Sequence, residues 1–165
     1  MADSDAPRRQ LRYAIIGAGM AGILAGLKLN EDGDSDYTIY EKGDSVGGTW
    51  RENRYPGLTC DVPSHVYTYT FAPNPDWSRF FAGGPEIKGY FQRIADEYGV
   101  SPHILFDAEV VSCRYQDGRW HIETVNGLRD LVDVVIVAAG VLHHPRYPQI
   151  EGLDSFKGPC FHSAR

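Results

Sequence analysis

The sequence predicts an α/β fold built on a parallel sheet, and three observations support that prediction. A short apolar run, residues 11–16, ends in the pattern Gly-x-Gly-x-x-Gly at Gly17, Gly19 and Gly22. A helical pattern of small and apolar residues follows directly, and a second strand-like run, residues 37–41, ends in an acid. A strand, a glycine turn, a helix and an acid-ended strand, in this order, are the signature of a Rossmann-like dinucleotide-binding domain.

Each glycine of this turn has a physical role. Gly17 permits the tight passage from strand to helix, Gly19 lets the backbone approach a pyrophosphate, and Gly22 lets the helix pack closely on the sheet. The helix start also presents free N–H groups and the positive end of the helix dipole, which together attract phosphate. We therefore expect a dinucleotide pyrophosphate to lie against Gly17, Gly19, Met20, Ala21 and Gly22.

Glu41 stands where the fingerprint of this fold has an acid. It ends the second predicted strand, 19 residues after Gly22. A carboxylate at that position can accept hydrogen bonds from the hydroxyl groups of an adenosine ribose. An acid there, rather than an arginine, also argues against a ribose that carries a 2′-phosphate.

The rest of the chain departs from a simple alternation of strands and helices. Residues 42–69 form no clear helix, and their glycine and aromatic content indicates a functional loop rather than disorder. Residues 85–98 place apolar side chains on one face behind a proline, which predicts a helix. Residues 104–125 alternate and turn at 116–118, which predicts an antiparallel β-meander, and the apolar run at 131–139 predicts a central parallel strand.

Composition indicates an ordinary folded domain and excludes some partners. The 165 residues, 42% of them hydrophobic, suggest one domain with a buried core, and no apolar run approaches the roughly 20 residues of a membrane span. The net charge of −6 argues against nucleic acid or a membrane surface as the main partner. Cys60, Cys113 and Cys160 lack paired spacing, and no cluster has metal-ligand spacing. We therefore predict reduced thiols, no metal and a cytoplasmic protein.

Several motifs together resemble the class B flavoprotein monooxygenases, and most closely the Baeyer–Villiger monooxygenases. The resemblance runs from about residue 11 to the last residue, and its last motif is similar to the start of the family's Phe-x-Gly-x-x-x-His-x-x-x-Trp fingerprint. Ala138-Ala139-Gly140 stands where the family often has Ala-Thr-Gly. The motifs are the glycine turn, Glu41, Val46 to Trp50, Asn53 to Gly57, Cys60 with Asp61, Tyr67, and Phe156 to His162.

The resemblance implies a role for each matched residue. Asp61 is expected to lie near the isoalloxazine and nicotinamide rings and to help position them, as the catalytic residue of this part of the enzyme. His162 belongs to a fingerprint thought to link domains. The residues expected to bind FAD are Gly17, Gly19, Met20, Ala21, Gly22, Glu41, Lys42, Gly48, Thr49, Trp50, Asp61, Tyr67, Val110, Ala139 and Gly140.

The resemblance also implies a reaction and a division of the chain. In that family NADPH reduces FAD, O₂ forms a C4a-peroxyflavin, and the peroxide converts a ketone into an ester or lactone. The family's second Gly-x-Gly-x-x-Gly domain, which binds NADPH, is missing here, so we expect an incomplete two-dinucleotide flavoprotein that is inactive alone. We expect a flexible tail over 1–10, an FAD-binding Rossmann-like domain over 11–142, and a linker over 143–165 that leads to the missing domain.

The same residues also bear on other classes of protein. A nucleotide-binding domain without catalysis and an N- or S-oxidising flavin monooxygenase both fit the motifs and stay open. A short-chain NAD-dependent dehydrogenase needs a lysine four positions after a tyrosine, and none of the ten tyrosines has one. A flavin disulfide reductase needs a close cysteine pair, which this chain lacks.

Overall fold

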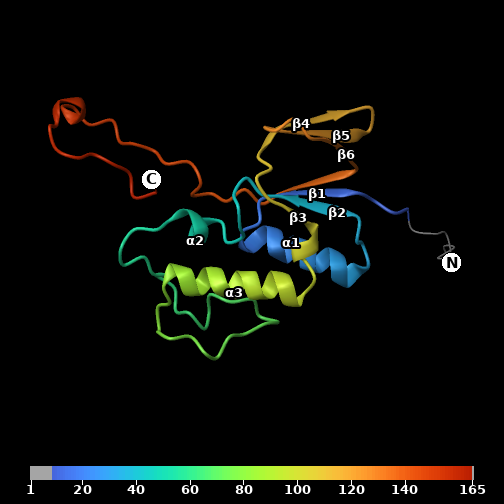
Figure 1. Ribbon diagram of the computed structural model, residues 1–165, viewed down its shortest axis with the longest axis horizontal. Helices are drawn as coiled ribbons and strands as arrows, with labels where there is room; N and C mark the ends of the chain where they lie inside the picture. Colours follow the sequence, from blue (N-terminus) through green and yellow to red (C-terminus); the bar gives the residue numbers. More distant parts are fainter. Residues whose placement is uncertain (1–8, 165) are drawn as a thin grey trace, which may run out of the picture.

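A computed structural model describes residues 9–164 and has a four-stranded parallel sheet in its middle layer (Figure 1). Its strands are β1 (Tyr13–Ile16), β2 (Tyr37–Tyr40), β3 (Ile104–Leu105) and β7 (Val134–Val137). The order is β3-β2-β1-β7, so β1 lies between β2 and β7. The carboxyl ends of these three strands therefore meet at one edge of the sheet, as a Rossmann-like fold requires.

Two helices, α1 (Met20–Asp32) and α3 (Gly84–Glu97), cover one face of this sheet (Figure 1). The helical pattern after the glycine turn is α1, and the helix predicted over 85–98 is α3, shifted by one residue at each end. Gly26 lets α1 approach the sheet, because a Cβ there would lie 3.0 Å from the Tyr37 ring and 3.1 Å from Ile39. On α3, Phe91 and Ile94 are fully buried in the same core. Each such side chain stabilises the fold by roughly 1.5–3 kcal/mol through burial.

An antiparallel sheet covers the opposite face, in the order β4-β5-β6 (Figure 1). Its strands are β4 (Val110–Gln116), β5 (Arg119–Thr124) and β6 (Arg129–Val132). The predicted meander is confirmed for β4 and β5, which turn at Asp117 and Gly118, both with positive φ. Ile122 and Val132 form a second, smaller core with Ala14 and Tyr40 of the parallel sheet.

The apolar run at 131–139, predicted as one central strand, is two strands in two sheets. β6 ends at Val132, and β7 begins at Val134 on the edge of the described parallel sheet. Asp133 separates them, and its carboxylate accepts the backbone N–H of Arg12 at 3.0 Å. The prediction was wrong because hydrophobicity alone does not show where a chain changes sheets.

Two other predictions need correction. Ile104–Leu105 was assigned to the meander but forms β3, which pairs in parallel with Ile39 and Tyr40 of β2. The loop over 42–69, predicted without a helix, contains the single turn α2 (Thr49–Glu52). Four residues are too few for a helical period to be visible in the sequence.

Short turns complete the described chain. The 3₁₀ turns cover Ser101–His103 and Leu153–Ser155, and residues 141–164 form an extended arm that leaves the body (Figure 1). Residues 1–8 of the predicted flexible tail lie outside the described part, while Arg9 pairs with Asp133 at 2.7 Å. In the described range, no helix has the length and apolar character needed to cross a membrane.

Arg12 holds the amino ends of the strands together. It stands directly before β1, and its guanidinium donates to Asp130 at 2.6 and 3.0 Å and to Asp36 at 2.6 Å. Tyr40 donates to the same Asp130 carboxylate at 2.6 Å. Burial acts to raise the pKa of Asp130, but the hydrogen bonds from Arg12 and Tyr40 outweigh it and lower that pKa. The resulting stabilisation is complete above the ordinary pKa of an aspartate and is lost as the pH falls through the lowered value.

Replacing Arg12 with alanine is expected to lower the free energy of unfolding at pH 7 by about 1–3 kcal/mol, because two half-buried carboxylates lose their shared cation. Chemical denaturation measures the change. Arg129→Ala is the matched control, since the Arg129 side chain is 80% exposed and pairs with Glu123 at the surface. That control should stay within about 0.5 kcal/mol of the wild type. Equal losses in the two variants would contradict the assigned role.

Candidate functional site

The glycine turn lies at the edge where β1, β2 and β7 end. Gly17 follows β1 with a φ of 103°, and a Cβ there would lie 2.6 Å from the carbonyl oxygen of Ala138. A Cβ on Gly22 would lie 1.8 Å from the carbonyl oxygen of Gly17. Helix α1 therefore begins directly against the strand ends, with Gly19 as its N-cap. Gly19 has no side chain to accept from the first N–H groups, which leaves them for an outside acceptor such as phosphate.

A second glycine pair closes against the first. Gly47 and Gly48 both have positive φ, and the N–H of Gly47 donates to the carbonyl of Ala18 at 3.1 Å. A Cβ on Gly48 would lie 3.2 Å from the Cα of Gly19, so the two backbones touch with only hydrogen atoms between them. The two turns form a floor of bare backbone, on which a flat or extended ligand can approach the main chain.

Glu41 joins this floor to β2 and is buried, with 4% of its surface exposed. Its Oε2 accepts the N–H of Ala18 at 2.8 Å. Its Oε1 accepts the N–H of Gly43 at 2.8 Å and a guanidinium N–H of Arg51 at 2.6 Å. A carboxylate offers about four acceptor directions. Three are used here, so a ribose hydroxyl would have to donate to Oε2.

Arg51 is a site residue that the sequence did not reveal. Its guanidinium donates to Glu41, to the carbonyl of Ser45 at 3.0 Å and to Glu52 at 3.3 Å, and its side chain is 12% exposed. It lies flat over Gly43, where a Cβ would meet it at 1.8 Å. In the sequence, Arg51 could be noticed only as a cation shortly after the second glycine pair. That observation indicates a site residue only once Glu41 is known to be buried.

Aromatic residues of the loop meet beside this floor. Trp50 donates its indole N–H to the Tyr67 hydroxyl at 3.2 Å, and the two rings stand edge to face at 5.7 Å. The Tyr69 hydroxyl donates to the carbonyl of Met20 at 2.5 Å, which ties the loop to the start of α1. Thr49 and Asp61 are exposed, Thr49 as the first residue of α2 and Asp61 in the loop. The structure thus brings together Trp50 and Tyr67, two residues of the predicted ligand set.

The remaining predicted ligands are Ala139, Gly140, Val110 and Lys42. Ala139 and Gly140 follow β7 and are exposed at the carboxyl edge, next to the glycine turn that Ala138 contacts. Val110 begins β4 and packs on the smaller core with Tyr40. Lys42 follows Glu41 and pairs with Glu52 at 3.2 Å. No group of three or more His, Cys, Asp or Glu side chains within residues 9–164 is arranged to hold a metal ion.

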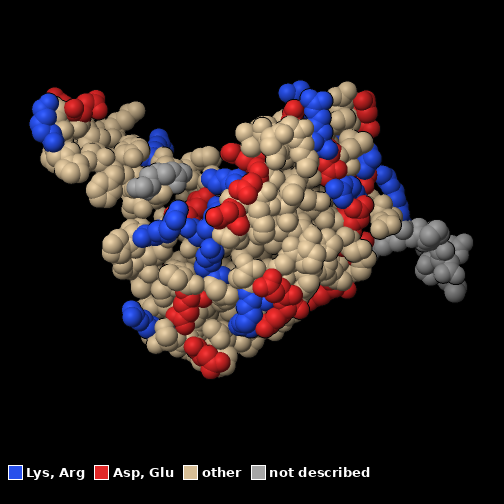
Figure 2. Space-filling view, viewed as in Figure 1, with Lys and Arg blue, Asp and Glu red and all other residues tan. Residues whose placement is uncertain are grey.

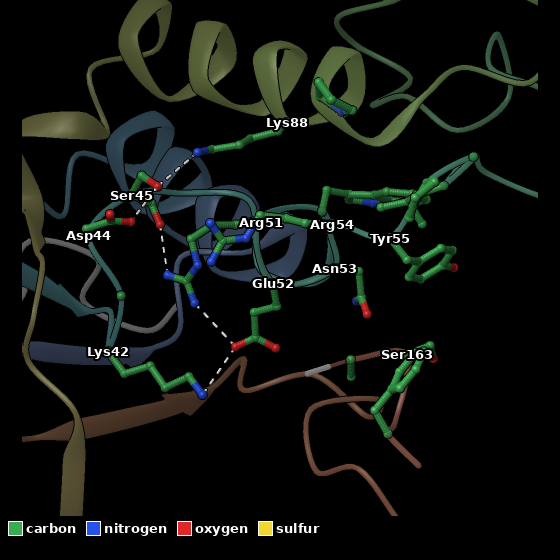
Figure 3. A pocket seen from close by; sticks show the side chains of 18 of the residues that line it. Lys42, Asp44, Ser45, Arg51, Glu52, Asn53, Arg54, Tyr55, Lys88 and Ser163 are labelled. Carbon is green, nitrogen blue, oxygen red and sulfur yellow. Dashed lines mark hydrogen bonds and ion pairs between the residues drawn. The ribbon is translucent and has the colours of Figure 1, made fainter. Parts of the chain in front are cut away.

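A cavity of about 1330 Å³ opens beside the glycine floor, between the loop, α3 and the C-terminal arm (Figure 3). Four cations line it, together with acids that partly balance them, and Figure 2 shows basic and acidic side chains side by side on this part of the surface. The cavity and the predicted ligand set share Lys42 and Trp50, whereas the glycine turn itself lies outside the cavity lining. The cationic residues are Lys42, Arg51, Arg54 and Lys88.

Comparisons with known proteins agree with this geometry. A family profile described as an NAD(P)-binding Rossmann-like domain matches residues 15–83. An uncharacterised monooxygenase of Mycobacterium tuberculosis is 55% identical over 92% of this chain. A Baeyer–Villiger monooxygenase of Streptomyces coelicolor is 46% identical over 100% of it. This chain is homologous to the Baeyer–Villiger monooxygenases.

Solved structures of such monooxygenases share the fold. A complex of OTEMO with FAD and NADP is 38% identical and superposes with a TM-score of 0.82 over 94% of this chain. Cyclohexanone monooxygenase from Rhodococcus sp. Phi1, bound to NADP⁺, is 32% identical with a TM-score of 0.82 over 93%. The chain spans only about a third of these relatives, between 30% and 32% of each protein named. The predicted fold class and the predicted family resemblance are confirmed.

Gly22→Ala is expected to destabilise the protein by about 1–3 kcal/mol or more, because the new methyl group meets a backbone oxygen that cannot move away. Thermal and chemical unfolding measure it. Gly89→Ala is the matched control, since Gly89 lies within α3 and a Cβ there has no neighbour within 4 Å. Alanine there should be neutral or stabilise by up to about 1 kcal/mol through helix propensity. A Gly22→Ala protein as stable as the wild type would contradict the close packing described.

Proposed function

We propose that this chain is the FAD-binding part of an NADPH- and O₂-dependent flavin monooxygenase of the Baeyer–Villiger type. The observation that carries the proposal is the floor of two touching glycine turns at the carboxyl edge of β1, with the buried Glu41 beside it. Relatives named as FAD-binding monooxygenases, and a related structure titled as a complex with FAD and NADP, support the same ligand for this chain.

The residues present fit a flavin nucleotide. A Cβ on Gly48 would lie 3.2 Å from the Cα of Gly19, and the bare backbone of these two touching turns suits the approach of a pyrophosphate beside them. In this proposal the first N–H groups of α1 bind that pyrophosphate, and Glu41 accepts a ribose hydroxyl on Oε2. Trp50 and Tyr67 border the flavin end, where the exposed Asp61 helps to orient the rings. Bound FAD would supply the electron transfer and the oxygen activation.

For the complete enzyme we propose a small ketone as the substrate, oxidised to an ester or lactone with NADPH as the reductant. The Baeyer–Villiger name of the Streptomyces coelicolor relative supports this choice over the oxidation of nitrogen or sulfur. A cytoplasmic location agrees with three free thiols: Cys60 is buried, Cys113 half-buried and Cys160 exposed.

Titration with FAD tests the proposal. The wild-type chain is expected to bind FAD in preference to NAD⁺, and Glu41→Gln should weaken FAD binding by roughly 1–3 kcal/mol through the loss of a charge-assisted hydrogen bond. Flavin fluorescence or calorimetry measures the affinity, and thermal unfolding shows that the variant is folded. Glu31→Gln, an exposed acid at the far end of α1, is the control. A wild type without FAD affinity, or a folded Glu41→Gln with full affinity, would refute the site.

A further inference from the structure

His143 lies in the segment after β7, and its ring bridges two residues of the site. Its Nε2 stands 2.7 Å from the Lys42 ammonium, and its Nδ1 stands 3.1 Å from Oε2 of Glu52. Lys42 and Glu52 also pair with each other at 3.2 Å, and Figure 3 shows their side chains converging. The His143 side chain is 20% exposed, so this is a packed contact and not a loose surface pair.

The partners determine where the proton of the ring lies. An ammonium group can only donate a hydrogen bond, and the Lys42 ammonium lies 2.7 Å from Nε2 and 3.5 Å from Nδ1. The carboxylate of Glu52 can only accept, and it faces Nδ1, so a proton on Nδ1 donates to it. These contacts fit a neutral His143 in the Nδ1–H form, with the ammonium beside the unprotonated Nε2.

The bridge spans the edge at which the nucleotide site lies. Lys42 comes two residues after the end of β2, and His143 comes six residues after the end of β7. Because β1 lies between those strands, the contact joins the two sides of the edge from which the glycine turn opens. Glu52 adds α2 to the same link. These contacts thus join β2, α2 and the segment after β7 at the edge where a ligand on the glycine floor would lie.

The charges facing His143 explain what its protonation would do. With a neutral ring, Lys42 and Arg51 balance Glu41 and Glu52 through the ion pairs that connect them. Among residues 9–164, the ring of His143 also faces His144, with ring centroids 4.6 Å apart. A proton on Nε2 would remove the bond from Lys42 and place two cations 2.7 Å apart. Burial acts to raise the pKa of Glu52, but hydrogen bonds from Lys42 and His143 outweigh it and lower that pKa.

We propose that His143 is a positioning residue of the flavin nucleotide site, which holds Lys42 and Glu52 across the edge when its ring is neutral and releases Lys42 when the ring is protonated. The inference rests on the proposed function, because it assigns the bridge to that same site. Neutral His143 closes the edge around the bound nucleotide and slows its release. Protonation opens this link and weakens binding.

Two substitutions of His143 separate the effect of its hydrogen bonds from the effect of protonating its ring. The amide of His143→Gln can accept from Lys42 and donate to Glu52 but does not titrate, whereas His143→Phe keeps a ring without either hydrogen bond. FAD affinity of the 165-residue chain is measured at about pH 8 and about pH 5.5. The wild type is expected to lose about tenfold in affinity between them, as for one hydrogen bond to a charged group. His143→Gln should bind equally well at both pH values, and His143→Phe about tenfold more weakly than the wild type at the higher pH.

Each other outcome has a definite meaning. Wild-type affinity that is unchanged or higher at the lower pH would overturn the inference, as would a wild type and His143→Gln with identical pH profiles. Thermal unfolding checks that His143→Phe is folded. If that variant does not fold, the comparison of wild type with His143→Gln decides alone. A wild type that binds no FAD at either pH would instead overturn the proposed function, so the two failures are distinguishable.

Discussion

The buried carboxylate of Glu41 is the interaction on which the rest of the site depends. It accepts hydrogen bonds from the turn after β1, from the residue after Lys42 and from Arg51 of α2. An ionised group with 4% exposure is tolerated only because all of these donors reach it. Removing it would leave two backbone N–H groups without their acceptor and Arg51 with only Ser45 and Glu52 as partners, so one side chain links the glycine turn, β2 and α2.

The parallel sheet is held by charge at both of its ends. Its strands are only two to four residues long, so backbone pairing alone contributes few hydrogen bonds. At the amino edge Arg12 forms ion pairs with Asp36 and Asp130, and at the carboxyl edge Glu41 forms an ion pair with Arg51. The amino edge is structural. The carboxyl edge also carries the glycine floor, and its ion pairs continue through Glu52 and Lys42 to His143. Stability and ligand binding are therefore coupled at that edge.

Much of this organisation was predictable from the sequence because it rests on local rules. Glycines that must avoid a Cβ clash, such as Gly17 and Gly22, appear as a fixed spacing, and α1 and α3 appear as apolar periodicity. The parts that were missed depend on tertiary contacts. Arg51 has meaning only beside a buried Glu41, and the break at Asp133 depends on the backbone of Arg12, more than a hundred residues away in the sequence. The pairing of β3 with β2 is equally non-local.

The most direct test is a crystal structure of this chain grown with FAD. We expect a pyrophosphate on the N–H groups at the start of α1, beside the touching backbones of Gly19 and Gly48, with a ribose hydroxyl on Oε2 of Glu41. We also expect the His143 ring to remain between Lys42 and Glu52. Density for FAD confined to the cavity lined by Arg54 and Lys88, with no part of the nucleotide on the glycine floor, would contradict it.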